Sequence, residues 1–103
     1  MNLTSYPDGE GRLSIHFEGD LTIYEAAQVR ESLLALVDGA GAVELDLAEV
    51  GEIDSAGLQL LLATALTLAA NGGSLCLARA SAAVAEAIGL LGLGRRLPIT
   101  SLA

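Results

Sequence analysis

The chain has 103 residues, with 13 acidic side chains, five arginines, no lysine and one cysteine. This length predicts a single domain over residues 1–103 whose core can form without disulfides or a metal. A lone cysteine excludes an internal disulfide. An acidic surface repels phosphate backbones and anionic lipid headgroups, so we expect no nucleic-acid partner.

The first part of the chain predicts two strands and a helix. Residues 3–6 fit a short strand, residues 7–11 a turn, and residues 12–18 alternate apolar and polar side chains like a strand with one solvent-exposed face. Thr22 and Glu25 have the spacing of a capping box, which predicts the start of a helix. The apolar positions expected on its buried face are Ile23, Ala26, Ala27, Leu33, Leu34 and Val37.

The second part predicts alternating strands and helices. Residues 43–47 and 74–78 fit strands, residues 56–70 a helix that is apolar on nearly all sides, and residues 97–100 an edge strand. Ser81 can cap a third helix. The charge-free stretch 55–78 is interrupted by Asn71-Gly72-Gly73, which leaves fewer than the roughly 20 apolar residues of a membrane span. We therefore expect a buried helix and no direct membrane insertion.

These elements predict an α/β fold with a mixed sheet of four to five strands and three or four helices on one side. The first two strands have the short connection of a hairpin. The later strands are joined through helices, which implies parallel pairing with right-handed connections. Because the strands over residues 12–18 and 43–47 each have a polar face, helices are expected to cover only one side of the sheet.

The side chains that usually carry catalysis are scarce. His16 falls on the polar face of its strand with no cysteine or acid at metal-ligand spacing, so it is interpreted as a solvated strand residue. Cys76, between two leucines, is interpreted as a buried small hydrophobe. Without lysine there is no phosphate-binding loop of the P-loop type. We expect no catalytic residue, no metal site and no cofactor, and hence no enzyme.

The most informative segment is the turn at residues 54–57, where a strand leads into a leucine-rich helix. The free backbone N–H groups of a helix start can receive an anion or a partner's side chain. Alternatively, Asp54 or Ser55 only caps the helix, which contributes about 1 kcal/mol. Gly57 costs up to ~1 kcal/mol relative to alanine in the first turn. One reason to keep it is that something must approach the backbone closely.

Several motifs together resemble the STAS domain family, which includes bacterial anti-sigma factor antagonists and sulfate-transporter cytoplasmic domains. The turn Ile53-Asp54-Ser55-Ala56-Gly57-Leu58 after an acidic-apolar strand is the most specific of them. The resemblance extends over roughly residues 13–97. Its other motifs are Gly19-Asp20-Leu21-Thr22, Glu44-Leu45-Asp46-Leu47, Gly72-Gly73-Ser74-Leu75-Cys76-Leu77 and Ile88-Gly89-Leu90-Leu91-Gly92-Leu93.

The resemblance implies a STAS-like fold and a non-enzymatic regulatory module that docks on a protein partner through the second helix and adjoining loops. In the anti-sigma factor antagonists, a partner kinase phosphorylates the turn. A phosphoryl group there finds helix N–H groups but repels nearby carboxylates. The partner-binding residues expected by this resemblance are Asp20, Thr22, Asp54, Ser55, Ala56, Gly57, Leu58 and Gln59.

The chain departs from the antagonist pattern at two positions. The usual phospho-acceptor directly precedes the glycine, and that residue is Ala56 here, which cannot be phosphorylated. The family's acid after Gly-x-Leu is replaced by Thr22. Ser55 remains as a candidate acceptor, or it only caps the helix. The turn is more similar to STAS proteins of chemotaxis and signalling operons, or to the STAS subunit of phospholipid-transport ABC complexes. Residues 19–24 with Ala26-Ala27 favour the signalling branch.

Three kinds of protein contact are considered for this chain, the first two of them implied by the resemblance. An anti-sigma kinase or a chemotaxis-type signalling protein is the expected partner, and a transporter ATPase, stabilised by a constitutively bound subunit, is the alternative. A homodimer through the edge strand or the third helix is a further option. A cytoplasmic location is expected because residues 1–10 are polar and acidic, unlike a secretion signal.

Overall fold

The computed structural model describes residues 1–102. They form a four-stranded sheet in the order β1-β2-β3-β4, in which β1 and β2 are antiparallel and the other neighbours are parallel. This arrangement confirms the predicted mixed α/β class. The elements are β1 (Asn2–Pro7), β2 (Arg12–Leu21), α1 (Ile23–Val37), β3 (Ala42–Ile53), α2 (Ser55–Ala70), β4 (Ser74–Ala80) and α3 (Ala82–Leu90).

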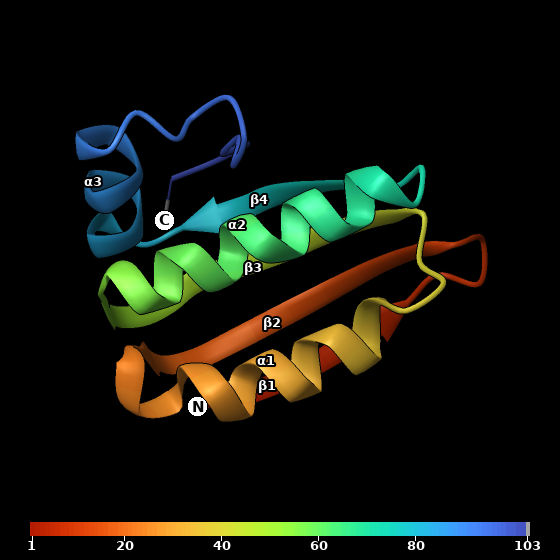
Figure 1. Cartoon of the computed structure of the whole chain (residues 1–103), viewed down its shortest axis with the longest axis horizontal. Helices are drawn as coiled ribbons and strands as arrows, with labels where there is room; N and C mark the ends of the chain where they lie inside the picture. The colour runs from red at the N-terminus through yellow and green to blue at the C-terminus, as the bar shows by residue number, and fades with distance from the viewer. Residues whose placement is uncertain (103) are drawn as a thin grey trace.

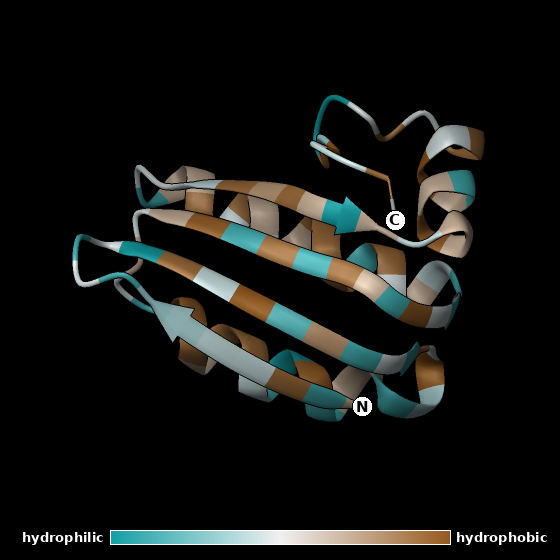
Figure 2. Ribbon diagram, turned by 180° about the vertical axis from the view of Figure 1, so that it is seen from behind, coloured by the Kyte–Doolittle hydropathy of each residue, from teal (hydrophilic) through white to brown (hydrophobic). Residues whose placement is uncertain are grey.

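The helices cover one face of the sheet, as the half-polar strands predict. In Figure 1, α1 and α2 lie side by side in front of the sheet, and α3 lies beside the end of β4. The opposite face is open, and Figure 2 shows polar and apolar residues alternating along β2 and β3 there. The side chains that the helices bury include Ile15, Phe17, Leu21, Leu33, Leu45, Leu47, Leu61, Leu77 and Leu97, each with no exposed surface.

Strands β2 and β3 run beyond their predicted ends, to Leu21 and Ile53. The parallel pairing shifts register between His16 and Glu18 and again between Gly19 and Leu21. A register shift changes which residues of a strand face the core. The alternation in the sequence therefore stops at Leu47, although the strand continues.

Two expectations about helix faces are wrong. Ile23 is 67% exposed instead of buried, and Val29 contributes to the buried face of α1 together with Leu33 and Val37. Helix α2 buries only one side, and Leu66 on its outer side is 51% exposed. Among the described elements the helices form one layer, so the outer side of α2 faces solvent despite its apolar sequence.

The predicted edge strand at residues 97–100 is reduced to two isolated parallel bridges, Leu77 to Ile99 and Ala80 to Leu102. The Leu77 N–H donates to the Pro98 carbonyl at 2.8 Å, while Pro98 itself has no N–H to continue a ladder. This segment still covers part of the outer edge of β4. No helix within residues 1–102 is long and apolar enough to cross a membrane.

Candidate partner-binding site

Asp54 joins the starts of two helices. It is the N-cap of α2, where its Oδ1 accepts a hydrogen bond from the Gly57 N–H at 3.1 Å. Its Oδ2 accepts from the Ile23 N–H, the first residue of α1, at 2.8 Å. The bonds from Ile23 and Gly57 hold the pKa of the Asp54 carboxyl below its usual range. Of the two capping residues left open by the sequence, the structure selects Asp54.

The start of α1 carries a second local carboxylate contact. Thr22 is the N-cap, and the Glu25 carboxylate accepts from the Thr22 hydroxyl at 2.6 Å and from the Thr22 N–H at 3.3 Å. The hydroxyl bond is the main cause that lowers the pKa of Glu25. The predicted Thr22–Glu25 pair therefore marks this helix start correctly.

Gly57 is required by internal packing. A Cβ on this residue would lie 2.2 Å from the Leu21 carbonyl oxygen and 2.9 Å from Ile53 Cγ1. The close approach expected from the sequence is thus made by the end of β2 within the same chain. Gly57 and Leu58 are both buried, so neither residue is part of the surface offered to a partner.

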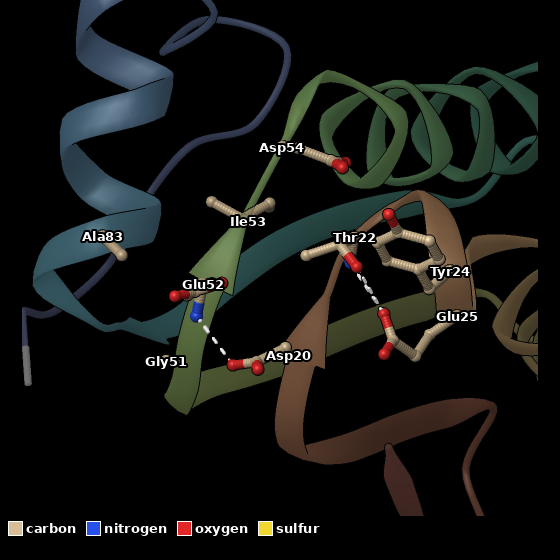
Figure 3. A pocket seen from close by; sticks show the side chains of 9 residues that line it. All are labelled: Asp20, Thr22, Tyr24, Glu25, Gly51, Glu52, Ile53, Asp54 and Ala83. Carbon is tan, nitrogen blue, oxygen red and sulfur yellow. Dashed lines mark hydrogen bonds between the residues drawn. The ribbon is translucent and has the colours of Figure 1, made fainter.

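An acidic groove opens beside these helix starts, between α1, the ends of β2 and β3, and α3 (Figure 3). It has a volume of about 540 Å³. Asp20 belongs to its wall, where Oδ1 accepts from the Glu52 N–H at 3.0 Å. We call this hollow the acidic groove because four of its lining residues are acids and none is basic. Its lining residues are Asp20, Thr22, Tyr24, Glu25, Gly51, Glu52, Ile53, Asp54 and Ala83.

Tyr24 is a groove residue that the sequence interpretation missed. It lines the acidic groove and is 92% exposed, next to the exposed Ile23. An exposed aromatic residue can contribute a large contact area to a protein interface. Its position two residues after Thr22, off the expected apolar face of α1, was a signal that could have identified it.

A second hollow, the helix groove, lies between α1 and α2 and has a volume of about 340 Å³. Ala56 and Gln59 line it, and Arg30 is its charged residue. Ser55, the first residue of α2, is exposed, and its hydroxyl is not the helix cap. The structure therefore divides the predicted residues. The acidic groove is lined by Asp20, Thr22 and Asp54, and the helix groove by Ala56 and Gln59. The other two predicted residues, Gly57 and Leu58, are buried below the surface.

Comparison with known proteins decides the family. A family model described as "Mlab, STAS domain" matches residues 6–101. The chain belongs to the STAS domain family. No match was found among curated proteins. An anti-sigma factor antagonist from Mycobacterium paratuberculosis is 27% identical, with a TM-score of 0.79 over 95% of this chain and 85% of that chain.

Two further solved structures share the fold. SpoIIAA, an anti-sigma factor antagonist in its unphosphorylated form, is 19% identical with a TM-score of 0.79 over 95% of this chain and 87% of that chain. The murine anion transporter Slc26a9 is 18% identical with a TM-score of 0.76 over 88% of this chain but 16% of that chain. The STAS fold thus occurs both in proteins of this size and as a small part of a transporter. STAS domains of the antagonist type are generally non-enzymatic.

Proposed function

We propose that this STAS domain is a regulatory protein-interaction module that acts in the cytoplasm and docks on a signalling protein through the start of α2. The observation that carries the proposal is the junction at Asp54. One carboxylate holds the starts of α1 and α2 together and leaves the exposed Ser55 between the acidic groove and the helix groove. A surface built on two helix starts and two strand ends is rigid, which lowers the entropy cost of binding.

The two grooves define the chemistry of the partner. The acidic groove favours a basic side chain, such as arginine, which can form charge-assisted hydrogen bonds with carboxylates. The helix groove is lined by alanine, glutamine and leucine beside Arg30, and residues 55–78, which include α2, carry no charge. An apolar patch beside a charged rim is the usual composition of a protein interface. We infer that an anti-sigma kinase or a chemotaxis-type protein presents the complementary surface.

Ser55 is the residue at which this contact is open to regulation. A phosphoryl group on its exposed hydroxyl would gain from the free N–H groups of the α2 start. It would also add close to two negative charges beside a groove that already holds Asp20, Glu25, Glu52 and Asp54. The repulsion and the added bulk oppose docking of the same partner. Regulation at Ser55 would replace the switch that Ala56 cannot provide.

Affinity capture tests this proposal. Wild type, Ser55→Glu and the control Ser32→Glu are used as baits in lysate of the native host, and captured proteins are identified by mass spectrometry. Ser32 is an exposed serine on α1 that lines neither groove. We expect wild type and Ser32→Glu to capture a signalling kinase or chemotaxis-type protein, and Ser55→Glu to bind that purified protein at least tenfold more weakly. Equal affinity of all three baits for the captured protein would reject the proposal that this protein docks at the turn around Ser55.

A second candidate is a constitutive subunit that stabilises a transporter ATPase. It is favoured by Ala56 at the usual acceptor position and by the exposed apolar Leu66 on α2. A permanent interface is larger and more apolar than a transient one, so it should survive high salt. Co-purification with an ATPase at 1 M salt, unaffected by Ser55→Glu, would support this candidate. Dissociation of that complex by salt would count against it.

A further inference from the structure

A polar cluster lies on the open face of the sheet, opposite the helices. His16 on β2 is 2.6 Å from Glu49 Oε2 through Nε2 and 3.3 Å from Asp46 Oδ2 through Nδ1. The sequence interpretation of His16 as a solvated strand residue without an acid at metal-ligand spacing missed these two carboxylates. Its partners belong to β3, about thirty residues away along the chain, and the parallel pairing of β2 with β3 brings them together.

Asp46 is held in place by other groups. Its Oδ2 accepts from the Arg79 guanidinium on β4 at 2.9 Å, and its Oδ1 accepts from the Ala48 N–H at 3.1 Å. A carboxylate fixed in this way can orient the imidazole through Nδ1 and direct Nε2 outward. This is the arrangement by which metal-binding histidines are usually positioned.

Glu18 adds a second carboxylate on the outward side of His16. It lies directly across from Glu49 in the β2–β3 register. One ligand atom each from His16, Glu18 and Glu49 lie within 4.8 Å of one another. Like charges opposite each other on neighbouring strands are destabilising. With Asp46 balanced by Arg79, two carboxylates are left around one imidazole, and a divalent cation would neutralise them.

We infer that His16, Glu18 and Glu49 form a binding site for a divalent transition-metal ion of the zinc class. An imidazole nitrogen with carboxylate oxygens suits zinc, whereas magnesium and calcium prefer oxygen ligands alone. Ligand atoms of a tetrahedral zinc are about 3.3 Å apart, since each bond is about 2.0–2.1 Å long. The distance of 2.6 Å between His16 Nε2 and Glu49 Oε2 therefore has to increase slightly when the ion binds. The Glu49 side chain is 54% exposed and has room to move.

The site would be shallow and open to solvent, because the His16 side chain is 25% exposed and Glu18 lies on the surface. Water would complete the coordination. The cluster lies on the face of the sheet that α1 and α2 do not cover, so metal binding and partner docking use different surfaces. The inference is thus independent of the proposed function.

Isothermal titration calorimetry with Zn²⁺ tests the inference in a buffer that does not coordinate metals. We expect one Zn²⁺ per wild-type chain. His16→Asn and Glu49→Gln should each bind at least tenfold more weakly. The positioning variant Asp46→Asn should lose about tenfold or more, as changes in the outer shell of metal sites do. The control is Glu31→Gln, which removes an exposed acid from α1 and should bind like wild type.

Two results would overturn the site. One is the absence of saturable Zn²⁺ binding by the folded wild type. The other is binding that His16→Asn leaves unchanged, which would mean unspecific attraction of the cation to surface carboxylates. Circular dichroism checks that each variant is folded. If His16→Asn does not fold, Glu18→Gln and Glu49→Gln replace it as the test variants. In addition, the absorption bands of Co²⁺ bound to the wild type report directly whether nitrogen and oxygen ligands surround the ion.

Discussion

The two faces of the sheet carry polar surfaces that are built in different ways. On the helix side, the acidic groove depends on Asp54 and Glu25, whose carboxylates accept hydrogen bonds from groups at the starts of α1 and α2. On the open side, His16, Asp46 and Arg79 come from three strands and contact one another through side chains. The first surface is held largely by the main chain, whereas the second depends on long side chains that can exchange partners.

This difference has consequences for stability and binding. A surface fixed by main-chain hydrogen bonds is coupled to folding, because its loss also frees helix ends. Exposed ion pairs between side chains contribute little to stability and are free to rearrange around a ligand. We therefore expect substitutions of the capping and close-packed residues at the helix starts to affect folding first, and those on the open side to affect ligand binding first.

The largest expected effect is that of Gly57→Ala. The added methyl group would lie 2.2 Å from the Leu21 carbonyl oxygen, so the start of α2 has to move away from β2. We expect a loss of about 3 kcal/mol in the free energy of unfolding, measured by urea denaturation. Gly89→Ala in α3 is the matched control, because no atom beyond its chain neighbours and the nearby backbone of α3 lies within 4 Å of its added methyl group. That change should be neutral or slightly stabilising. Similar losses in both variants would refute the close-approach explanation.

Asp54→Ala should have the next largest effect. The substitution removes both the cap of α2 and the acceptor for the Ile23 N–H of α1. We expect a lower urea midpoint than wild type, with a smaller change than for Gly57→Ala, and faster amide hydrogen exchange at both helix starts. Glu52→Ala removes a charge from the same groove without removing a helix cap. If Glu52→Ala lowered the midpoint equally, charge and not capping would be the cause.

Acid should weaken the helix side of the molecule. The pKa values of Asp54 and Glu25 are lowered in the folded protein by hydrogen bonds from Ile23 and from Thr22, respectively. Because the folded-state pKa is lowered, the contribution of each carboxylate to folding stability is complete above the usual carboxyl pKa range. That contribution is lost as the pH falls through the folded-state pKa. The urea concentration at the unfolding midpoint should therefore decrease once the pH is below about 4.5. The urea midpoint of Asp54→Ala should decrease less with acid than that of wild type. An equal decrease in both proteins would contradict the role of Asp54 in this pH dependence.

Leu66→Glu should have the smallest effect on folding. Leu66 is 51% exposed on the outer side of α2, so the free energy of unfolding should change by about 0.5 kcal/mol or less. Binding of the captured partner should weaken strongly if the outer side of α2 belongs to the interface. Leu90→Glu, at a 78% exposed position at the end of α3, is the control for the added charge. Equal binding by both variants would confine docking to the grooves.

The sequence by itself predicted the order of the elements, the one-sided sheet and the family. These depend on local patterns: alternation in residues 12–18, the Thr22–Glu25 spacing, and the contiguous turn from Asp54 to Leu58. Local patterns report on structure because hydrogen bonding within a helix and the two faces of a strand repeat at fixed intervals. The turn also located the helix start at which Asp54 is the cap.

The tertiary structure alone decided what these residues contact. The β2–β3 pairing continues past two register shifts to Leu21 and Ile53 and sets Glu18 against Glu49. The single helix layer left Ile23 and Leu66 exposed, although their sequence context predicted burial. The approach of Gly57 to Leu21 and the meeting of His16 with Asp46 and Glu49 join residues thirty or more positions apart. Such contacts are created when strands pair, and no local interval in the sequence encodes them.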